Sequence, residues 1–271
     1  ANIKLDLPAG TEFISRYRSV DPNPIKDVFA NINSHFSKIY EENPERLKDV
    51  DWLKENVPFT GELSLGHLRY GTFGGNTIDR CHPFLKQSNW RSRNLVVAGN
   101  FNLTNVDEIF AQLVQLGQHP KEMADTVTVM EKIGHFLDAE NSRLYGKFKK
   151  EGLNDIQANN RIEEEIDIQK VLQKAAALWD GGYAMAGLLG HGDAFVLRDP
   201  AGVRPAYYYH DDEIAVITSE RPPIQTALNI PADKIKEIKP GHAVIIKKNG
   251  EISEKPILAE LPKKPCSFER I

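Results

Sequence analysis

The sequence is poor in cysteine, in long apolar runs and in any excess of charge. Its two cysteines, Cys81 and Cys266, are too few for a disulfide framework. No apolar run approaches the roughly 18–20 residues that cross a bilayer, and no signal-peptide pattern opens the chain. The 34 basic and 38 acidic side chains nearly cancel, which argues against a nucleic-acid surface or a polybasic membrane anchor. These absences predict a cytoplasmic protein with no nucleic-acid or membrane partner.

The common cofactor and metal motifs are missing as well. There is no Walker loop, no dinucleotide glycine fingerprint, no CxxC pair and no HExxH. The histidines are scattered without the spacing of metal ligands. We therefore expect neither a cofactor nor a metal site in this chain.

The sequence predicts a block of helices followed by a block of strands. Apolar spacing predicts helices from Pro24 onward and over 106–117, 124–137 and 161–179, with Thr104 or Asn105 as the cap of the second. Strands are predicted over 61–71 and 94–99, and a run of strands follows Gly182. Asn249-Gly250 is a strong hairpin signal. This block pattern indicates an α+β fold, and we expect one domain over residues 1–271.

Several polar residues stand at the predicted ends of strands and helices. They are Arg69, Asn100, Asp125, the pair Arg198-Asp199 and the pair Ser219-Glu220. Taken singly, each has an ordinary structural explanation: a surface ion pair, a turn or a helix cap. They point to function only if one ligand explains them together.

The residues and the order of seven motifs indicate such a ligand. The motifs resemble those of class II glutamine amidotransferases, most closely the glutaminase part of amidophosphoribosyltransferase. The matching segments, in order, are "GHLRYGT", "GNFNLTN", "ADT", "GGYAMAGLL", "VLRDPAGVRPAYY", "VITSERPPIQTA" and "IKPGHAVII", and the terminal "CSFERI" resembles the lead into the phosphoribosyltransferase half.

The resemblance implies an N-terminal-nucleophile hydrolase fold, an αββα sandwich of two stacked sheets between helical layers. It implies glutamine as substrate and hydrolysis that supplies ammonia for phosphoribosylamine, the entry step of purine synthesis. Residues 1–271 would then be a glutaminase domain cut at both ends, without its first strands. The phosphoribosyltransferase domain would follow residue 271 and bind Mg²⁺ with phosphoribosyl pyrophosphate, in a parent protein that forms homo-oligomers.

The same resemblance assigns roles to single residues. Asn100, through its side-chain amide, and Phe101, through its backbone N–H, match the oxyanion hole, where fixed donors stabilise the tetrahedral intermediate by about 3–4 kcal/mol each. Arg69 matches the guanidinium that holds the glutamine α-carboxylate, and Thr72 a helper at that carboxylate. Asp125 matches the acceptor of the α-ammonium. We expect the polar ends of Arg69, Thr72, Asn100 and Asp125 to face one cleft.

Three features depart from the family. Ala1 stands at the start, whereas the family nucleophile is an N-terminal Cys whose own amine acts as base. Phe101 stands where the family has Gly, and Gly99 where it has His. We expect Phe101 to keep a negative φ, because a left-handed conformation would cost about 1–3 kcal/mol. Cys81 is predicted to be an apolar filler, and Cys266 alone cannot hold the iron–sulfur cluster of some relatives.

Two other interpretations stay open. The chain could be a glutaminase-like binding or regulatory module that has lost its nucleophile. It could also come from another amidotransferase, such as a glucosamine-phosphate or asparagine synthetase. The Arg-Asp-Pro segment 198–200 and the terminal "CSFERI" favour the amidophosphoribosyltransferase over the latter.

Overall fold

The computed structural model describes residues 1–69, 77–120 and 123–267, and these fold as two compact units. The first unit comprises Ala1–Ala98 with Leu188–Gly192, and the second comprises Gly99–Gly187 with Asp193–Ile271. A single domain over the whole chain therefore stays a prediction, and the two units are described separately below.

The first unit contains a small antiparallel sheet and a helical hairpin. Its sheet has the order β2-β1-β3, from strands Ile14–Ser15, Asn2–Ile3 and Leu63–Ser64. Helix α1 (Pro24–Glu42) begins with proline, as predicted, and a 3₁₀ turn over Pro44–Lys48 leads into α2 (Val50–Asn56). Strand β4 (Phe84–Lys86) pairs antiparallel with the beginning of β5 (Leu95–Leu103).

The second unit is built on a larger sheet of antiparallel strands. Its strands have the order β12-β11-β7-β6-β5. They are Ile252–Pro256, His242–Ile246, Ala194–Arg198, Gly181–Leu189 and the end of β5. The predicted Asn249-Gly250 turn joins β11 to β12, and Gly250 takes the left-handed φ of 87° that this turn favours.

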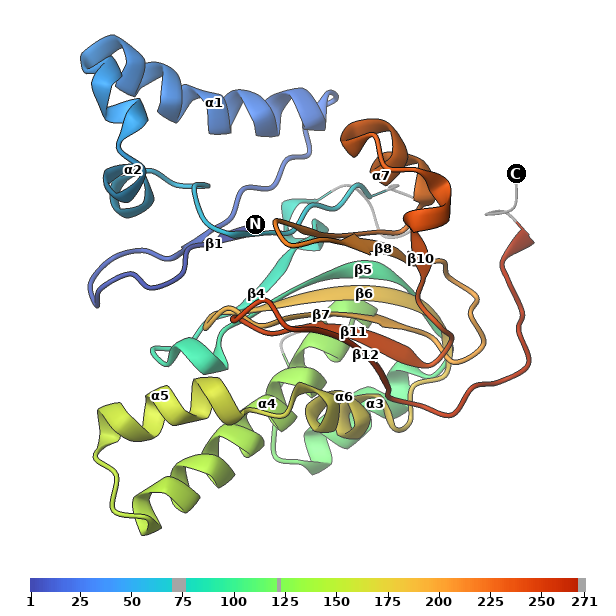
Figure 1. The fold of residues 1–271 in the computed structure, drawn as a ribbon. Helices are drawn as coiled ribbons and strands as arrows, with labels where there is room; N and C mark the ends of the chain where they lie inside the picture. Colours follow the sequence, from blue (N-terminus) through green and yellow to red (C-terminus); the bar gives the residue numbers. More distant parts are fainter. Residues whose placement is uncertain (70–76, 121–122, 268–271) are drawn as a thin grey trace. The chain divides into compact units, whose positions relative to one another are not determined.

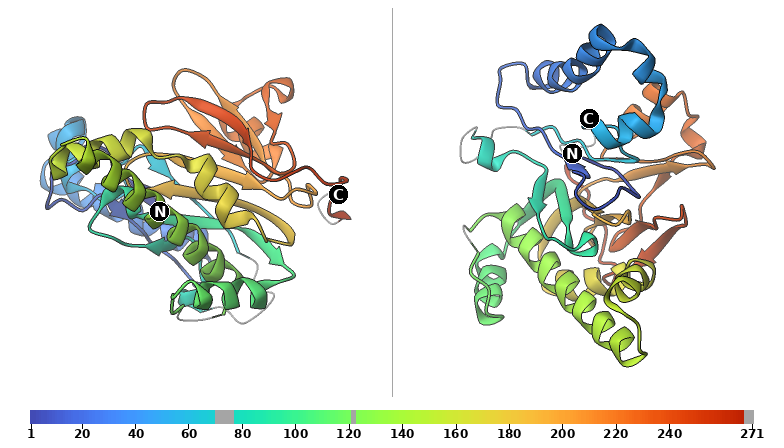
Figure 2. Two further views of the ribbon diagram at one scale, coloured as in Figure 1. Left: turned by 90° about the horizontal axis from the view of Figure 1, so that it is seen from below. Right: turned by 90° about the vertical axis from the view of Figure 1, so that its left-hand side faces the viewer.

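Within this second unit the layers run helix, sheet, sheet, helix. A smaller sheet, β10-β8-β9, lies on one face of the larger one and carries α7 (Figure 1). Helices α3 to α6 cross the opposite face (Figure 2). The smaller sheet comprises Lys236–Glu237, Tyr207–His210 and Ala215–Thr218, and the helices are Val106–Gln115, Asp125–Lys150, Asp155–Glu165, Ile168–Ala176 and, as α7, Arg221–Leu228. This is the αββα sandwich that the family resemblance implied.

The two sheets of the second unit are joined by a small apolar core. Ala206, Tyr208, Ile238 and Val244 are buried together. Partly buried side chains from both sheets pack against them, including Ala184 of β6 and Ile217 of β9. The side of β6 that carries Ala184 is therefore the side turned toward the smaller sheet.

Helix lengths differ from the predictions in two places. The helix predicted over 124–137 continues to Lys150, because Leu144 and Phe148 extend its buried face. Gly152 terminates it with a left-handed φ of 89°, and the Leu153 N–H donates to the Phe148 carbonyl in a Schellman-type C-cap. The single helix predicted over 161–179 is wrong. Asp167 accepts the Lys170 N–H and starts α6 as a separate helix after α5.

Two strands were also predicted with the wrong length. The strand expected over 61–71 is paired only at Leu63–Ser64, so Arg69 does not close a strand. The strand expected over 94–99 continues through Asn100 to Leu103, because the alternation of exposed and inward side chains continues to Leu103. None of the helices in the described residues is both long and apolar enough to cross a membrane.

One lysine of the second unit is buried without a charged partner. Lys132 of α4 is 3% exposed, and its ammonium donates to Gln112 Oε1 at 2.8 Å. No carboxylate pairs with it among the described residues. Burial lowers the pKa of Lys132, because the interior disfavours the charged form.

Replacing Lys132 by methionine, an apolar residue of similar length, tests how much stability the buried ammonium costs. At pH 7 we expect Lys132→Met to raise the free energy of unfolding by about 1 kcal/mol, because a buried charge is removed. A lysine with a lowered folded pKa costs stability below that pKa, and the cost fades as the pH rises through it. The gain should therefore shrink between pH 7 and pH 10.

Urea denaturation at several pH values measures both effects. The exposed Lys150 at the end of α4 provides the matched control, and Lys150→Met should show neither the gain nor its pH dependence. A Lys132→Met protein that is less stable than the wild type at pH 7 would contradict this assignment.

Candidate active site at the edge of strand β5

The register of β5 against β6 sets the direction of every polar group at the candidate site. The Thr104 N–H donates to the Asp180 carbonyl at 2.9 Å, so Thr104 faces β6. A Cβ at Gly99 would meet Ala184 O and Met185 Cα, and one at Gly181 would meet Asn102 O and Leu103 Cα. These contacts agree with one continuous antiparallel register, in which Asn100 lies opposite Ala184.

Backbone groups alternate along a strand, so the N–H of Phe101 points away from β6. The same is true of Leu103, whose N–H makes a long hydrogen bond of 3.4 Å to Asp125 Oδ2. The described pairs of β4 with β5 run from Leu95 to Val97 and end before Phe101. The Phe101 N–H and the Asp125 carboxylate therefore lie on the same edge of β5, two residues or about 7 Å apart along the strand.

Asn100 projects from the face of β5 that Ala184 shares, which is the side of the smaller sheet. Its side chain is exposed, as is that of Asn102 two residues later. The exposed amide of Asn100 and the edge-directed N–H of Phe101 come from adjacent residues. Two fixed hydrogen-bond donors in this arrangement can bind one oxygen that carries partial negative charge.

Phe101 keeps an ordinary backbone conformation. The positive-φ residues other than glycine within the described chain are Asp6, Phe59 and Asn229, which confirms the prediction of a negative φ for Phe101. Its half-buried ring lies over Gly99, since a Cβ at Gly99 would approach Phe101 Cζ to 2.8 Å. The glycine at 99 and the ring at 101 are thus complementary in shape on one face of the strand.

Asp125 is the first residue of α4 and is half-buried. The N-cap of α4 is Ala124, and no side chain makes a capping hydrogen bond there, so Asp125 is not the cap that the sequence suggests. Its position at the N-terminus of the helix places a carboxylate at the positive end of the helix dipole. An ionised carboxylate at this edge can bind an ammonium group.

The structure does not test the other two predicted site residues. Arg69 belongs to the first unit, where its Nη1 donates to the Arg80 carbonyl at 2.9 Å. Thr72 lies outside the described residues. The structure thus brings together Asn100, Phe101 and Asp125, and a cleft shared with Arg69 and Thr72 stays a prediction.

Thr104, Asn105 and Asp180 hold β5 in place. The sequence suggests Thr104 and Asn105 only as helix caps, and it gives no role to Asp180. Besides its backbone bond, Thr104 donates through its hydroxyl to the Asp180 carboxylate at 2.5 Å. Asn105 donates to the Leu178 carbonyl and accepts the Asp180 N–H, and it makes no capping bond to α3. The "LTN" motif therefore joins the ends of β5 and β6. A cap and a cross-link use the same residue types, so the sequence did not separate them.

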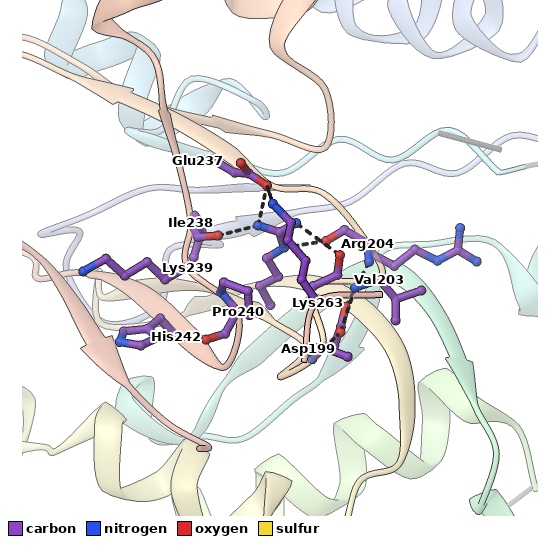
Figure 3. A network of polar contacts seen from close by, with 12 residues as sticks. Asp199, Val203, Arg204, Glu237, Ile238, Lys239, Pro240, His242 and Lys263 are labelled. Carbon is purple, nitrogen blue, oxygen red and sulfur yellow. Dashed lines mark hydrogen bonds and ion pairs between the residues drawn. The ribbon is translucent and has the colours of Figure 1, made fainter. Parts of the chain in front are cut away.

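The Arg198-Asp199 pair closes β7 as predicted, and it builds a buried polar network (Figure 3). Asp199 is fully buried and accepts the N–H groups of Tyr183, Ala201, Val203 and Arg204. Its role is to hold the turn after β7, which makes the structural explanation of this motif the better one.

Arg198 extends this network toward the smaller sheet. Its guanidinium donates to Glu237 and to the carbonyls of Arg204, Gly202 and Ile238. Burial alone would raise the pKa of Glu237, but hydrogen bonds from Arg198 and Lys263 outweigh it and lower that pKa. The network therefore joins β7 to β10 and to the segment around Lys263 (Figure 3).

Cys81 does not match its predicted role. It follows a 3₁₀ turn and is half-exposed, and its thiol donates to the Thr77 carbonyl at 3.4 Å. In the described chain no three His, Cys, Asp or Glu side chains converge as metal ligands.

Comparison with known proteins now bears on this geometry. No family model matches the chain. The amidophosphoribosyltransferase of Methanocaldococcus jannaschii is 28% identical over 196 residues, which are 72% of this chain and 35% of the relative. The Pseudomonas aeruginosa enzyme of that name is 24% identical and covers 91% of this chain and 46% of its own length. This chain is related to the amidophosphoribosyltransferases.

The fold agrees with that relationship. Glutamine phosphoribosylpyrophosphate amidotransferase from Bacillus subtilis, solved with ADP and GMP, superposes with a TM-score of 0.53 at 20% identity. The match covers 75% of this chain and 36% of that one. These neighbours share the mixed α/β fold with antiparallel sheets. The chain spans less than half the length of the amidophosphoribosyltransferases that it matches.

The shape match between Gly99 and Phe101 gives a stability prediction. A Cβ at Gly99 would lie 2.6 Å from Ala184 O and 2.8 Å from Met185 Cα, both of them backbone atoms that cannot move alone. We expect Gly99→Ala to lower the free energy of unfolding by about 2 kcal/mol or more, because the strand must shift.

Gly146 of α4 is the matched control. A Cβ there would meet nothing within 4 Å, so Gly146→Ala should raise helix stability by about 0.5–1 kcal/mol. Thermal unfolding of both variants shows whether Gly99→Ala destabilises the protein while Gly146→Ala stabilises it. Equal effects of the two substitutions would show that the backbone at Gly99 is free to adjust.

The Asp199 network gives a second stability prediction. Asp199→Asn replaces one acceptor oxygen by an NH₂ group that meets two N–H donors, so about 2–3 kcal/mol should be lost. The exposed Asp211 also accepts two backbone N–H groups, through Oδ1 alone, so Asp211→Asn should cost less than about 1 kcal/mol. Urea denaturation distinguishes them, and a mild Asp199→Asn would mean that the turn after β7 is held by other contacts.

Proposed function

We propose that this chain is the glutaminase domain of an amidophosphoribosyltransferase, and that the longer enzyme makes phosphoribosylamine for purine biosynthesis. The observation that carries the proposal is the geometry at β5. Asn100 and the Phe101 N–H form a donor pair, and the Asp125 carboxylate lies on the same edge. Amidophosphoribosyltransferase relatives over most of the chain support this assignment.

In this proposal the donor pair binds the side-chain carbonyl of glutamine. Hydrolysis of the amide places negative charge on that oxygen, and each fixed donor stabilises the charge by about 3–4 kcal/mol. A β-strand holds both donors without a flexible loop, which avoids reorganisation during the reaction. Phe101 can serve here because the backbone N–H, and not the side chain, is the donor.

Asp125 binds the α-ammonium of the substrate. The distance along β5 from the Phe101 N–H to the Asp125 contact, about 7 Å, is comparable to the length of a glutamine side chain. Arg69 and Thr72 hold the α-carboxylate, so that both charges of the amino acid are paired. Glutamine is thereby selected over amides that lack the amino-acid head.

Ala1 does not match the nucleophile that the family's mechanism requires. The family uses a Cys thiol with its own α-amine as base, and Ala1 has neither a thiol nor a hydroxyl. Phosphoribosyl pyrophosphate, its Mg²⁺ and the phosphoribosyltransferase domain belong, in this proposal, to the rest of a longer homo-oligomeric enzyme. The polypeptide of residues 1–271 should then bind glutamine without hydrolysing it.

Ammonia release tests this mechanism. We expect none from the 271-residue polypeptide, since binding residues alone leave the hydrolysis of an unactivated amide too slow to measure. A longer form that begins with the family's Cys-Gly-Ile should release ammonia, and Arg69→Ala should raise its KM. Turnover by the 271-residue chain would overturn the mechanism, and a silent longer form would favour a regulatory binding module.

Glutamine binding to the 271-residue polypeptide tests the site itself. Calorimetry should show that Asp125→Asn weakens binding by about tenfold or more, because the substrate ammonium loses a charged partner. Asp107, exposed in the first turn of α3, is the matched control, and Asp107→Asn should leave the affinity unchanged. Unchanged binding by Asp125→Asn would remove Asp125 from the site.

A further inference from the structure

The first unit encloses a cavity that the proposed glutamine chemistry does not use as a whole. The cavity has a volume of about 530 Å³, within the range of small-molecule sites. Helix α1 forms one wall through Ile25, Val28, Phe29 and Ile32, and Leu65 lies among the other lining residues. All of its lining residues belong to the first unit.

The apolar wall of α1 is poorly covered. Phe29 is 58% exposed and Ile25 is 53% exposed, although both lie on the helix face that lines the cavity. A helix of a folded protein normally packs such a face against its own core. The face therefore has apolar area available for a ligand.

The rest of the lining carries an excess of positive charge. Arg18 and Arg69 line the cavity, and Asp21 is the one carboxylate among its lining residues. Asp21 is exposed and accepts the Asn23 N–H at 2.7 Å.

Arg18 is the cation best placed for an anionic ligand. It is half-buried, and its Nη1 donates to the Cys81 carbonyl at 3.1 Å, a bond that fixes the guanidinium without neutralising it. Within the described residues Arg18 forms no ion pair with a carboxylate. Burial, and then the charge of Arg18, lower the pKa of Arg16, because the two guanidinium groups lie near each other.

His82 forms a neutral part of the wall. Its ring stacks on that of His67 with centroids 4.2 Å apart. Burial, together with the charges of His67 and Arg69, lowers the pKa of His82 to about 3. The ring is therefore uncharged at neutral pH and offers an aromatic surface rather than a second cation.

We propose that this cavity binds a small organic carboxylate with an apolar body. The body packs against Val28, Phe29 and Ile32 of α1, and the carboxylate receives hydrogen bonds from Arg18. A guanidinium suits this task because its planar set of donors matches the two oxygens of a carboxylate. Arg69 lines this cavity and also belongs to the proposed glutamine site, whereas Arg18 and the apolar wall of α1 have no part in that proposal.

The two cysteines provide an internal readout of occupancy. Cys81 lines the cavity, whereas Cys266 belongs to the second unit. We would use 4-phenylbutyrate as the probe, 4-phenylbutyramide as its uncharged match and acetate as the anion without an apolar body. Iodoacetamide alkylation of each cysteine, followed by peptide mass spectrometry, gives the two rates separately.

Only 4-phenylbutyrate should slow the alkylation of Cys81, and none of the three compounds should change the rate at Cys266. Arg18→Met should weaken the protection about tenfold, as expected for the loss of a charged hydrogen-bond partner. Arg46 stacks on Trp52 outside the cavity, so Arg46→Met is the matched control and should bind like the wild type.

A second variant tests the cavity without touching its charge. Val28→Trp should fill the apolar space and abolish protection of Cys81, while circular dichroism reports that the fold is kept. Equal protection by the carboxylate and the amide, or unchanged protection in both Arg18→Met and Val28→Trp, would overturn the proposal. An absence of protection by 4-phenylbutyrate in the wild-type chain would do the same.

Discussion

The pairing of β5 with β6 in one register is the constraint on which the candidate site depends. The side-chain period of a strand is two, so a slip by one residue would turn Asn100 to the helical face and the Phe101 N–H toward β6. The bonds from Thr104 and Asn105 to the Leu178–Asp180 segment fix this register at one end. At Gly99, where the backbones of the two strands approach closely, a larger side chain does not fit. The donors at 100 and 101 are thus positioned by contacts several residues away from them.

The same region shows how a departure from the family motif is accommodated. The family residues at 99 and 101 are His and Gly, and this chain has Gly and Phe. Both side chains lie on one face of β5, so bulk removed at one position is restored at the next on that face. The exchange leaves the backbone extended and the direction of the Phe101 N–H unchanged. A motif can therefore change at two positions without loss of the backbone donor.

The Arg-Asp-Pro segment has a different part in the protein. It is the most specific motif of the resemblance, but its side chains satisfy backbone groups and bind Glu237, and their described contacts do not reach the β5 edge. Buried charges of this kind are retained because removing one partner leaves the other unsatisfied. The motif thus specifies how the two sheets of the second unit are connected, and this explains why a highly recognisable segment contributes no substrate contact to the proposed site.

The sequence by itself determined the fold class, the helix that begins at Pro24, the hairpin at Asn249-Gly250 and the motifs of the amidophosphoribosyltransferases. The α+β class, the helix and the hairpin follow from local spacing and turn chemistry, which act over a few residues, and the αββα arrangement follows from the resemblance of the motifs. Only the tertiary structure decided that β5 continues past Asn100, that Asn105 cross-links two strands, and that the helix predicted over 161–179 breaks at Asp167. Asn and Asp serve equally well as caps, turns and cross-links, so their role is set by the partner that the fold brings to them.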